Sequence, residues 1–170
     1  MTADTSTPCA AAMRAFAAGD LATWTGLPAG CTDRDLTAEF SGGGGPGGDG
    51  RLSHVPAKFR TYSAGDPQRP IQAWFDGSDN AFLITWIAPT VVGDVDALLS
   101  TLGEPEHKLA PGIGYHADAH QWIYASRGLT LWVRERRNEI ARVAMYRPTT
   151  AADYENRLGG RDKTRYLPRR

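Results

Sequence analysis

The side chains best suited to bind a metal ion lie in the segment His116-Ala-Asp118-Ala-His120. In an extended backbone, a spacing of two would place His116, Asp118 and His120 on one face, where imidazole and carboxylate groups can coordinate zinc or iron. The chain has no second cluster of such residues, and a polar loop leading into a strand explains the same pattern. We therefore expect neither a metal nor a cofactor.

The glycine-rich run SGGGGPGGDG, residues 41–50, contains the spacing G-x-G-x-x-G from Gly42 to Gly47. A phosphate-binding loop of this kind follows a strand and opens a helix. Here the run follows a predicted helix, contains Pro46 and opens no helix. The sequence therefore indicates a flexible connection and not a phosphate site.

Other reactive side chains lack the context that catalysis needs. Cys31 with a distant histidine would form a nucleophile pair, but no local motif supports it. The carboxylate pairs Asp94/Asp96 and Glu104/Glu106 fit the start and the end of a predicted helix, with acid–base use left open. No reaction is predicted, and whether the chain is an enzyme is uncertain, with the balance toward a non-catalytic protein.

The elements that would position any site form an internal repeat. The stretches Phe59–Thr90 and Gln121–Thr150 each predict three antiparallel strands, at about 57–63, 71–75 and 80–88 and at about 121–125, 129–135 and 139–147. Matched positions in the two copies are Tyr62 and Tyr124, Trp74 and Trp132, Asn80 and Asn138, and Pro89 and Pro148. A predicted helix precedes each copy.

Capping residues mark the helices at Thr7, Thr32, Asp94 and Thr150, while residues 41–50 and 106–119 are predicted to be irregular. We expect an α+β fold in which two tandem helix-β-β-β units form a mainly antiparallel sheet with the helices on one face. The chain, 1–170, is predicted to be a single domain. Its parts are the units 27–90 and 94–150, a C-terminal helix at 150–159 and a basic tail at 161–170.

Composition limits the class of protein. The chain has 170 residues, 41% of them hydrophobic, and a net charge of zero, which fits a folded domain with a core. No apolar run approaches the roughly 20 residues of a membrane span, and the N-terminus does not resemble a signal peptide, so we expect a cytoplasmic protein without membrane contact. In that compartment Cys9 and Cys31 are expected to be buried thiols, with a bridge between them as the alternative.

Charge is unevenly distributed along the chain. Acidic side chains outnumber basic ones in residues 1–126, and the reverse holds in residues 127–170. This asymmetry could steer an acidic partner, or the two parts could complement each other within the molecule or in a homodimer. The tail RDKTRYLPRR is short and reads as a solvated end, so no nucleic-acid partner is expected.

Strand alternation predicts an unusual sheet face. In LTLWV, Leu129, Leu131 and Val133 share the side that helices would cover, which leaves Trp132 on the other side; Trp74 is placed in the same way in IQAWF. Aromatic and arginine side chains are enriched at binding hot spots. The predicted binding surface comprises Arg60, Tyr62, Trp74, Trp122, Tyr124, Trp132, Arg134, Arg142 and Tyr146.

Two alternatives to an exposed aromatic face stay open. The loops at 41–56 or 106–119, or a dimer partner, could cover these rings as a second small core. The strand register could also be wrong, because short apolar runs fix it poorly.

The segments LPAGCTDRDLTAEF at 27–40 and DVDALLSTLGEP at 94–105, with the strand triplets Phe59–Ala88 and Gln121–Arg147, resemble the tandem-repeat fold of the β-lactamase-inhibitor proteins. They also resemble the small lipoproteins of the outer-membrane assembly machine. The resemblance implies a concave aromatic face that docks a protein. Those relatives are exported and the inhibitors have disulfides within their repeats, whereas neither strand triplet here contains cysteine.

The opening segment MRAFAAGDLATW resembles a different group, the nuclear-transport-factor-2-like barrels, over about a dozen residues. That resemblance implies a ligand pocket with His or Asp as acid or base.

The predicted repeat and its aromatic and arginine-bearing sheet face favour a protein-binding module of inhibitor or immunity type. The alternative is a small pocket-containing enzyme or ligand carrier of a biosynthetic pathway, of cyclase or isomerase type.

Overall fold

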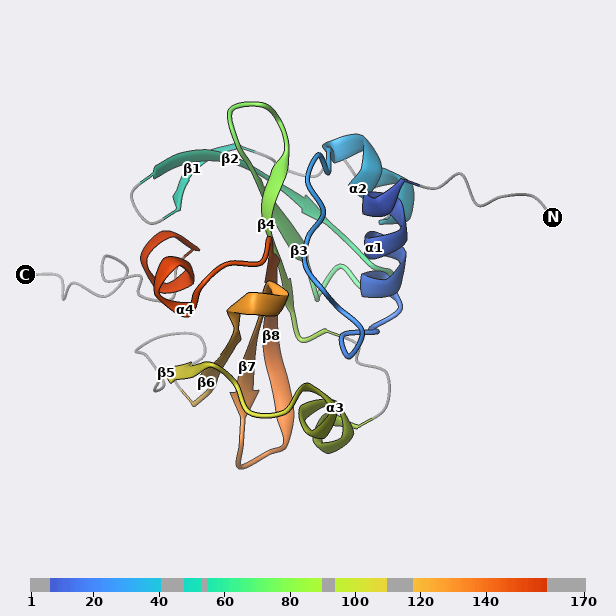
Figure 1. Ribbon diagram of the computed structural model, residues 1–170. Helices are drawn as coiled ribbons and strands as arrows, with labels where there is room; N and C mark the ends of the chain where they lie inside the picture. Colours follow the sequence, from blue (N-terminus) through green and yellow to red (C-terminus); the bar gives the residue numbers. More distant parts are fainter. Residues whose placement is uncertain (1–6, 41–47, 53–54, 90–93, 110–117, 159–170) are drawn as a thin grey trace, which may run out of the picture.

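The computed structural model describes residues 7–40, 48–52, 55–89, 94–109 and 118–158. Within these ranges, eight strands form one antiparallel sheet in the order β1-β2-β3-β4-β8-β7-β6-β5 (Figure 1). The strands are β1 (Gly48–Leu52), β2 (Val55–Tyr62), β3 (Ile71–Phe75), β4 (Ala81–Ile87), β5 (His107–Leu109), β6 (His120–Tyr124), β7 (Leu129–Arg134) and β8 (Glu139–Tyr146). The predicted α+β class with a mainly antiparallel sheet is confirmed.

The helices begin at the residues that the capping signals predict. They are α1 (Pro8–Ala17), α2 (Asp33–Glu39), α3 (Val95–Leu102) and α4 (Ala151–Asp153), the last continued by a π-helical turn, η2 (Tyr154–Leu158). The Asp94 carboxylate accepts from the Ala97 amide at 2.7 Å, and the Thr150 hydroxyl accepts from the Asp153 amide at 3.1 Å. Such bonds satisfy amides that the first helical turn leaves without partners.

The helices lie on both sides of the sheet. Figure 1 shows α1, α2 and α3 on one side, called here the helix side, and α4 on the opposite side, called the outer face. A large core on the helix side joins Phe16 of α1, Leu36 of α2 and Leu98 of α3 to the inward residues of the strands. A second core on the outer face includes Trp74, Tyr146 and Tyr154. The expectation that all helices share one face is therefore wrong for the C-terminal one.

Two strands lie in segments that were predicted to be irregular. β1 overlaps the glycine-rich run and pairs with β2, with Gly48 opposite Phe59. β5 has three residues and pairs with β6, with His107 opposite Ile123. Both are edge strands that form by backbone pairing with one neighbour. Their side chains do not alternate between apolar and polar, so the sequence pattern does not predict them.

A disulfide joins Cys9 of α1 to Cys31, just before α2, with the two Cα atoms 5.4 Å apart. Both side chains are buried. The prediction of two free buried thiols is wrong, because the turn between α1 and α2 brings the cysteines within bonding distance.

The segment that connects α1 to α2 crosses the end of β8. The Leu27 amide donates to the Tyr146 carbonyl oxygen at 2.9 Å, and the Trp24 indole nitrogen donates to the Gly128 carbonyl oxygen at 3.1 Å. Gly128 has a φ of 63°, and a Cβ there would lie 1.9 Å from the Tyr146 oxygen. Only glycine fits this crossing point.

Local irregularities recur at corresponding places in β2–β4 and β6–β8. The β3–β4 register shifts between Trp74 and Phe75, and the β7–β8 register shifts between Trp132 and Val133. The turns that follow contain a non-glycine residue with positive φ in each case, Asp79 at 59° and Asn138 at 52°. None of the helices in the described part of the chain is long and apolar enough to cross a membrane.

Candidate functional site

Five of the nine predicted surface residues lie on the outer face, as strand alternation predicts. Trp132 and Arg142 are directly opposite each other on β7 and β8, and Leu83 lies opposite both Trp74 and Tyr146. Directly paired residues share a face of the sheet. Arg134 follows Trp132 by two residues on β7 and therefore lies on the same face.

The other four, Arg60, Tyr62, Trp122 and Tyr124, lie on the helix side, so their predicted placement is wrong. Tyr62 is opposite Ile71 and Tyr124 is opposite Leu129, and all four of these side chains belong to the large core. A shift of one residue in a strand moves every side chain to the other face. In FRTYS and QWIYA, both alternating sets of side chains contain apolar residues. The sequence therefore does not indicate which set faces the helices.

The tyrosines on the helix side hold the helices to the sheet. The Tyr62 hydroxyl donates to the Asp33 carboxylate at the start of α2, and the Tyr124 hydroxyl donates to the Gly103 carbonyl oxygen at the end of α3 at 2.8 Å. Burial raises the pKa of Tyr62, and the nearby Asp33 charge raises it further. Trp122 is half-buried, with the Lys108 ammonium 3.9 Å from its ring centroid.

The C-terminal segment covers part of the outer face. The Tyr154 ring stacks on the Tyr146 ring with centroids 4.8 Å apart, and its hydroxyl donates to the Gln121 side-chain oxygen at 3.2 Å. Tyr146 is 0% exposed and Trp74 is 6% exposed. The expectation that these two rings meet water is therefore wrong. A second small core does form, as one alternative held. Tyr154 and Leu158 of the C-terminal segment contribute to it, together with Leu109 from the predicted loop 106–119.

Burial of the phenols is accompanied by satisfied hydrogen bonds. The Thr130 and Tyr146 hydroxyls are 2.9 Å apart, and the Tyr146 hydroxyl also donates to the Leu129 carbonyl oxygen at 3.2 Å. Burial raises the pKa of Tyr154 to about 12, and it raises the pKa of Tyr146 as well. Both rings therefore stay neutral at physiological pH and act as packing groups.

The remaining half-buried residues on β7 and β8 form what we call the Trp132 patch: Trp132, Arg134 and Arg142. The Arg142 guanidinium lies 5.0 Å from the Trp132 ring centroid, a cation–π arrangement. Arg134 bonds to Asp118 at 3.0 Å and approaches Glu139 at 3.5 Å. Neighbouring carboxylates thus fix the Arg134 side chain at the margin of the patch.

The predicted metal segment is only partly visible, because His116 lies outside the described residues. The hydrogen bond from Arg134 lowers the pKa of Asp118, which therefore acts as the partner of a cation. His120 is half-buried at the start of β6. Among the residues that the structure describes, no group of three His, Cys, Asp or Glu side chains could hold a metal ion.

Sequence reasoning missed two aromatic residues on the outer side of the molecule, Phe59 and Phe82, which pack half-buried against the second core. The Phe59 ring lies 5.1 Å from the Trp74 ring. The signal that could have found Phe59 is its pairing with Trp74 across β2 and β3. No family model, curated protein or solved structure matches this chain.

Proposed function

We propose that this chain is a non-catalytic protein-binding module, of inhibitor or immunity type, that contacts its partner through the Trp132 patch. One observation carries the proposal: a half-buried tryptophan with an arginine over its ring, held on two paired strands. Tryptophan and arginine are the residue types that dominate protein–protein binding energies.

The sheet provides a rigid base for this patch. Val133 and Val143, the neighbours of Trp132 and Arg142 along β7 and β8, point into the large core and are 1% and 0% exposed. A binding residue loses less entropy on association when its backbone is already fixed. Binding can therefore use the aromatic ring without first ordering a loop.

A two-unit architecture supports the comparison with inhibitor-like folds. Each unit would comprise a helix and the strands that follow it, with β4 and β8 pairing where the units meet. The recurring register shifts, the positive-φ turn residues and the two tyrosine-to-helix hydrogen bonds favour this interpretation. In this interpretation the C-terminal segment belongs to neither unit. It covers part of the outer face and so reduces the area that is open to a partner.

The disulfide bears on location. Disulfides persist mainly in oxidising compartments, so the Cys9–Cys31 bond favours such a compartment over the cytoplasm that we expected. Counting free thiols in protein isolated without added reductant would decide between the two: none are expected if the bond forms, and two if the chain resides in the cytoplasm.

The alternative function, a small enzyme or ligand carrier, requires the outer aromatic rings to surround a cavity. Trp74 instead packs against Phe59, and Tyr146 stacks on Tyr154. This ring-on-ring packing favours the binding module.

The test compares two tryptophans in similar settings. Trp132 and Trp122 are both half-buried and each lies beneath a cation, but they occupy opposite sides of the sheet. Immobilised wild-type protein, Trp132→Ala and Trp122→Ala would be compared for partner capture by quantitative mass spectrometry, after circular dichroism shows that each is folded. We expect Trp132→Ala to capture at least tenfold less partner than wild-type protein, and Trp122→Ala to capture the wild-type amount. Equal retention by both variants would contradict the proposal, and capture of the chain itself would identify a homodimer.

A further inference from the structure

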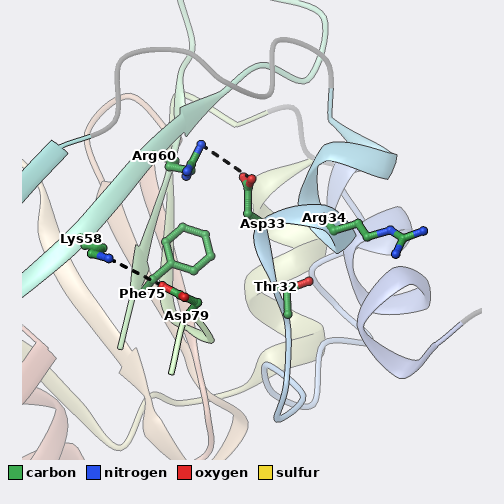
Figure 2. Close-up of a pocket in the computed structure, with 7 residues that line it drawn as sticks. All are labelled: Thr32, Asp33, Arg34, Lys58, Arg60, Phe75 and Asp79. Atoms are coloured by element: carbon green, nitrogen blue, oxygen red, sulfur yellow. Dashed lines mark ion pairs between the residues drawn. The ribbon is translucent and has the colours of Figure 1, made fainter. Parts of the chain in front are cut away.

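A separate pocket of about 350 Å³ opens on the helix side of the sheet, away from the Trp132 patch. It lies between the start of α2, the strand β2 and the turn from β3 to β4. Figure 2 shows its seven lining residues: Thr32, Asp33, Arg34, Lys58, Arg60, Phe75 and Asp79. Its volume falls at the lower end of the range for pockets that bind small molecules.

We propose that this pocket binds a small organic anion, with Lys58 and Arg60 holding its carboxylate or phosphate group. The proposal is independent of the function assigned to the Trp132 patch. The two sites share no residue.

The strand β2 places both cations on one wall. Lys58 and Arg60 are two residues apart and therefore project from the same face of the strand. Lys58 lies directly opposite Phe75, and Arg60 directly opposite Ala73. In Figure 2 the Phe75 ring lies beside Lys58 and below Arg60, whereas Arg34 points away from the pocket. An anion held by this wall would rest against an apolar ring.

The existing ion pairs are loose. The Arg60 guanidinium lies 3.7 Å from the Asp33 carboxylate, and the Lys58 ammonium lies 4.0 Å from the Asp79 carboxylate. The Lys58 and Asp79 side chains are 69% and 79% exposed, and exposed pairs of this kind contribute little to stability. A ligand anion can therefore replace Asp79 beside Lys58, because the Asp79 carboxylate is already largely solvated.

The arrangement of the charges favours an anion over a cation. Lys58 and Arg60 are the two basic side chains that face the pocket, which is also lined by two acids. One of these acids, Asp33, already accepts a hydrogen bond from Tyr62 in addition to its contact with Arg60. The planar guanidinium of Arg60 can form two parallel hydrogen bonds to a carboxylate or a phosphate. The ammonium of Lys58 would supply a second charge beside it.

The test follows backbone amide shifts by NMR while citrate or inorganic phosphate is added at constant ionic strength, with sodium chloride as the reference titration. We expect saturable shifts at residues 58, 60 and 75 with at least one of the two anions. Saturation with citrate alone would identify a carboxylate site, and saturation with phosphate alone a phosphate site. Shifts that stay linear, or that spread evenly over all basic residues, would overturn the proposal.

Matched substitutions complete the test. Lys58→Gln and Arg60→Gln should each weaken the apparent affinity at least tenfold. Arg69→Gln is the control, because Arg69 has the same 48% side-chain exposure as Arg60 and also contacts an aspartate, but lies outside the pocket. The Lys58 side chain is exposed, so its replacement should leave the fold unchanged. An unchanged affinity in Lys58→Gln would therefore overturn the assignment, as would an equal loss in the control.

Discussion

The strands β2–β4 and β6–β8 place the same residue types at corresponding positions but bury their tryptophans to different depths. Tyr62 and Tyr124 both lie on the helix side and hold a helix, whereas Trp74 and Trp132 both lie on the outer face. Trp74 is only 6% exposed, while Trp132 is half-buried beside Arg142. Alternation along a strand therefore sets which face a ring occupies, and the neighbouring segments set how much of it meets solvent.

The largest expected difference between the two regions concerns their tryptophans. Trp74→Ala should lower the free energy of unfolding by about 3–5 kcal/mol, because it removes a large ring from the second core. Trp132→Ala should lower it by about 1 kcal/mol, because the ring lies at the margin of that core. Urea denaturation followed by circular dichroism measures both values. Similar losses for the two variants would show that the difference in burial has no energetic consequence.

A disulfide near the first helix–strand region sharpens the comparison, because no cysteine lies in the second. Replacing both Cys9 and Cys31 with alanine should lower the free energy of unfolding by about 3 kcal/mol, since the bond closes a loop in the unfolded chain. Unfolding with and without reductant provides the measurement. Reductant should lower the free energy of unfolding of the wild-type protein and leave that of the double variant unchanged. A wild-type protein whose stability does not change with reductant would argue against the bond.

The two tyrosine hydroxyls should differ by a smaller amount. Tyr62→Phe should lower the free energy of unfolding by about 1.5 kcal/mol, because the hydroxyl donates to a charged carboxylate. Partial exposure of that carboxylate keeps the cost at the lower end for a charged acceptor. Tyr124→Phe should cost about 1 kcal/mol, because its acceptor is a neutral carbonyl. Chemical denaturation near pH 7 would compare them, with wild-type protein as the reference. A larger cost at Tyr124 would reverse the assigned order.

A further difference is expected in how stability changes at high pH. Burial, and then the nearby Glu104 charge, raise the pKa of Tyr124 to about 12, above its ordinary value near 10. Between these values the unfolded chain loses the phenolic proton and the folded chain retains it, so stability falls as pH rises. Tyr124→Phe should lose less stability than wild-type protein from pH 10 to 12 in denaturation experiments. Parallel curves would mean that this phenol does not contribute.

Sequence reasoning was most successful where local chemistry determines the structure. Asp94 and Thr150 begin helices because their side chains accept amide hydrogen bonds within the next turn. The alternation in β7 was predicted because Leu129, Leu131 and Val133 are aliphatic while the intervening Thr130 is polar. Such signals require no knowledge of distant residues.

The errors arose where distant segments decide the outcome. β2 and β6 have apolar residues on both faces because both faces contact a core, so a pattern of one buried and one exposed face does not apply to them. β1 forms by pairing with β2, and the disulfide forms because folding brings Cys9 and Cys31 together. The sequence predicts the C-terminal helix whose Tyr154 covers Tyr146. The residues 150–159 alone do not indicate on which side of the sheet that helix packs.

The crossing of the α1–α2 connection over the end of β8 restricts how the chain could be divided. A backbone cut between Pro89 and Asp94 would separate Trp24 and Leu27 from the Gly128 and Tyr146 carbonyl oxygens that they bind. The two resulting fragments would therefore be poorly structured alone and should regain their fold when mixed.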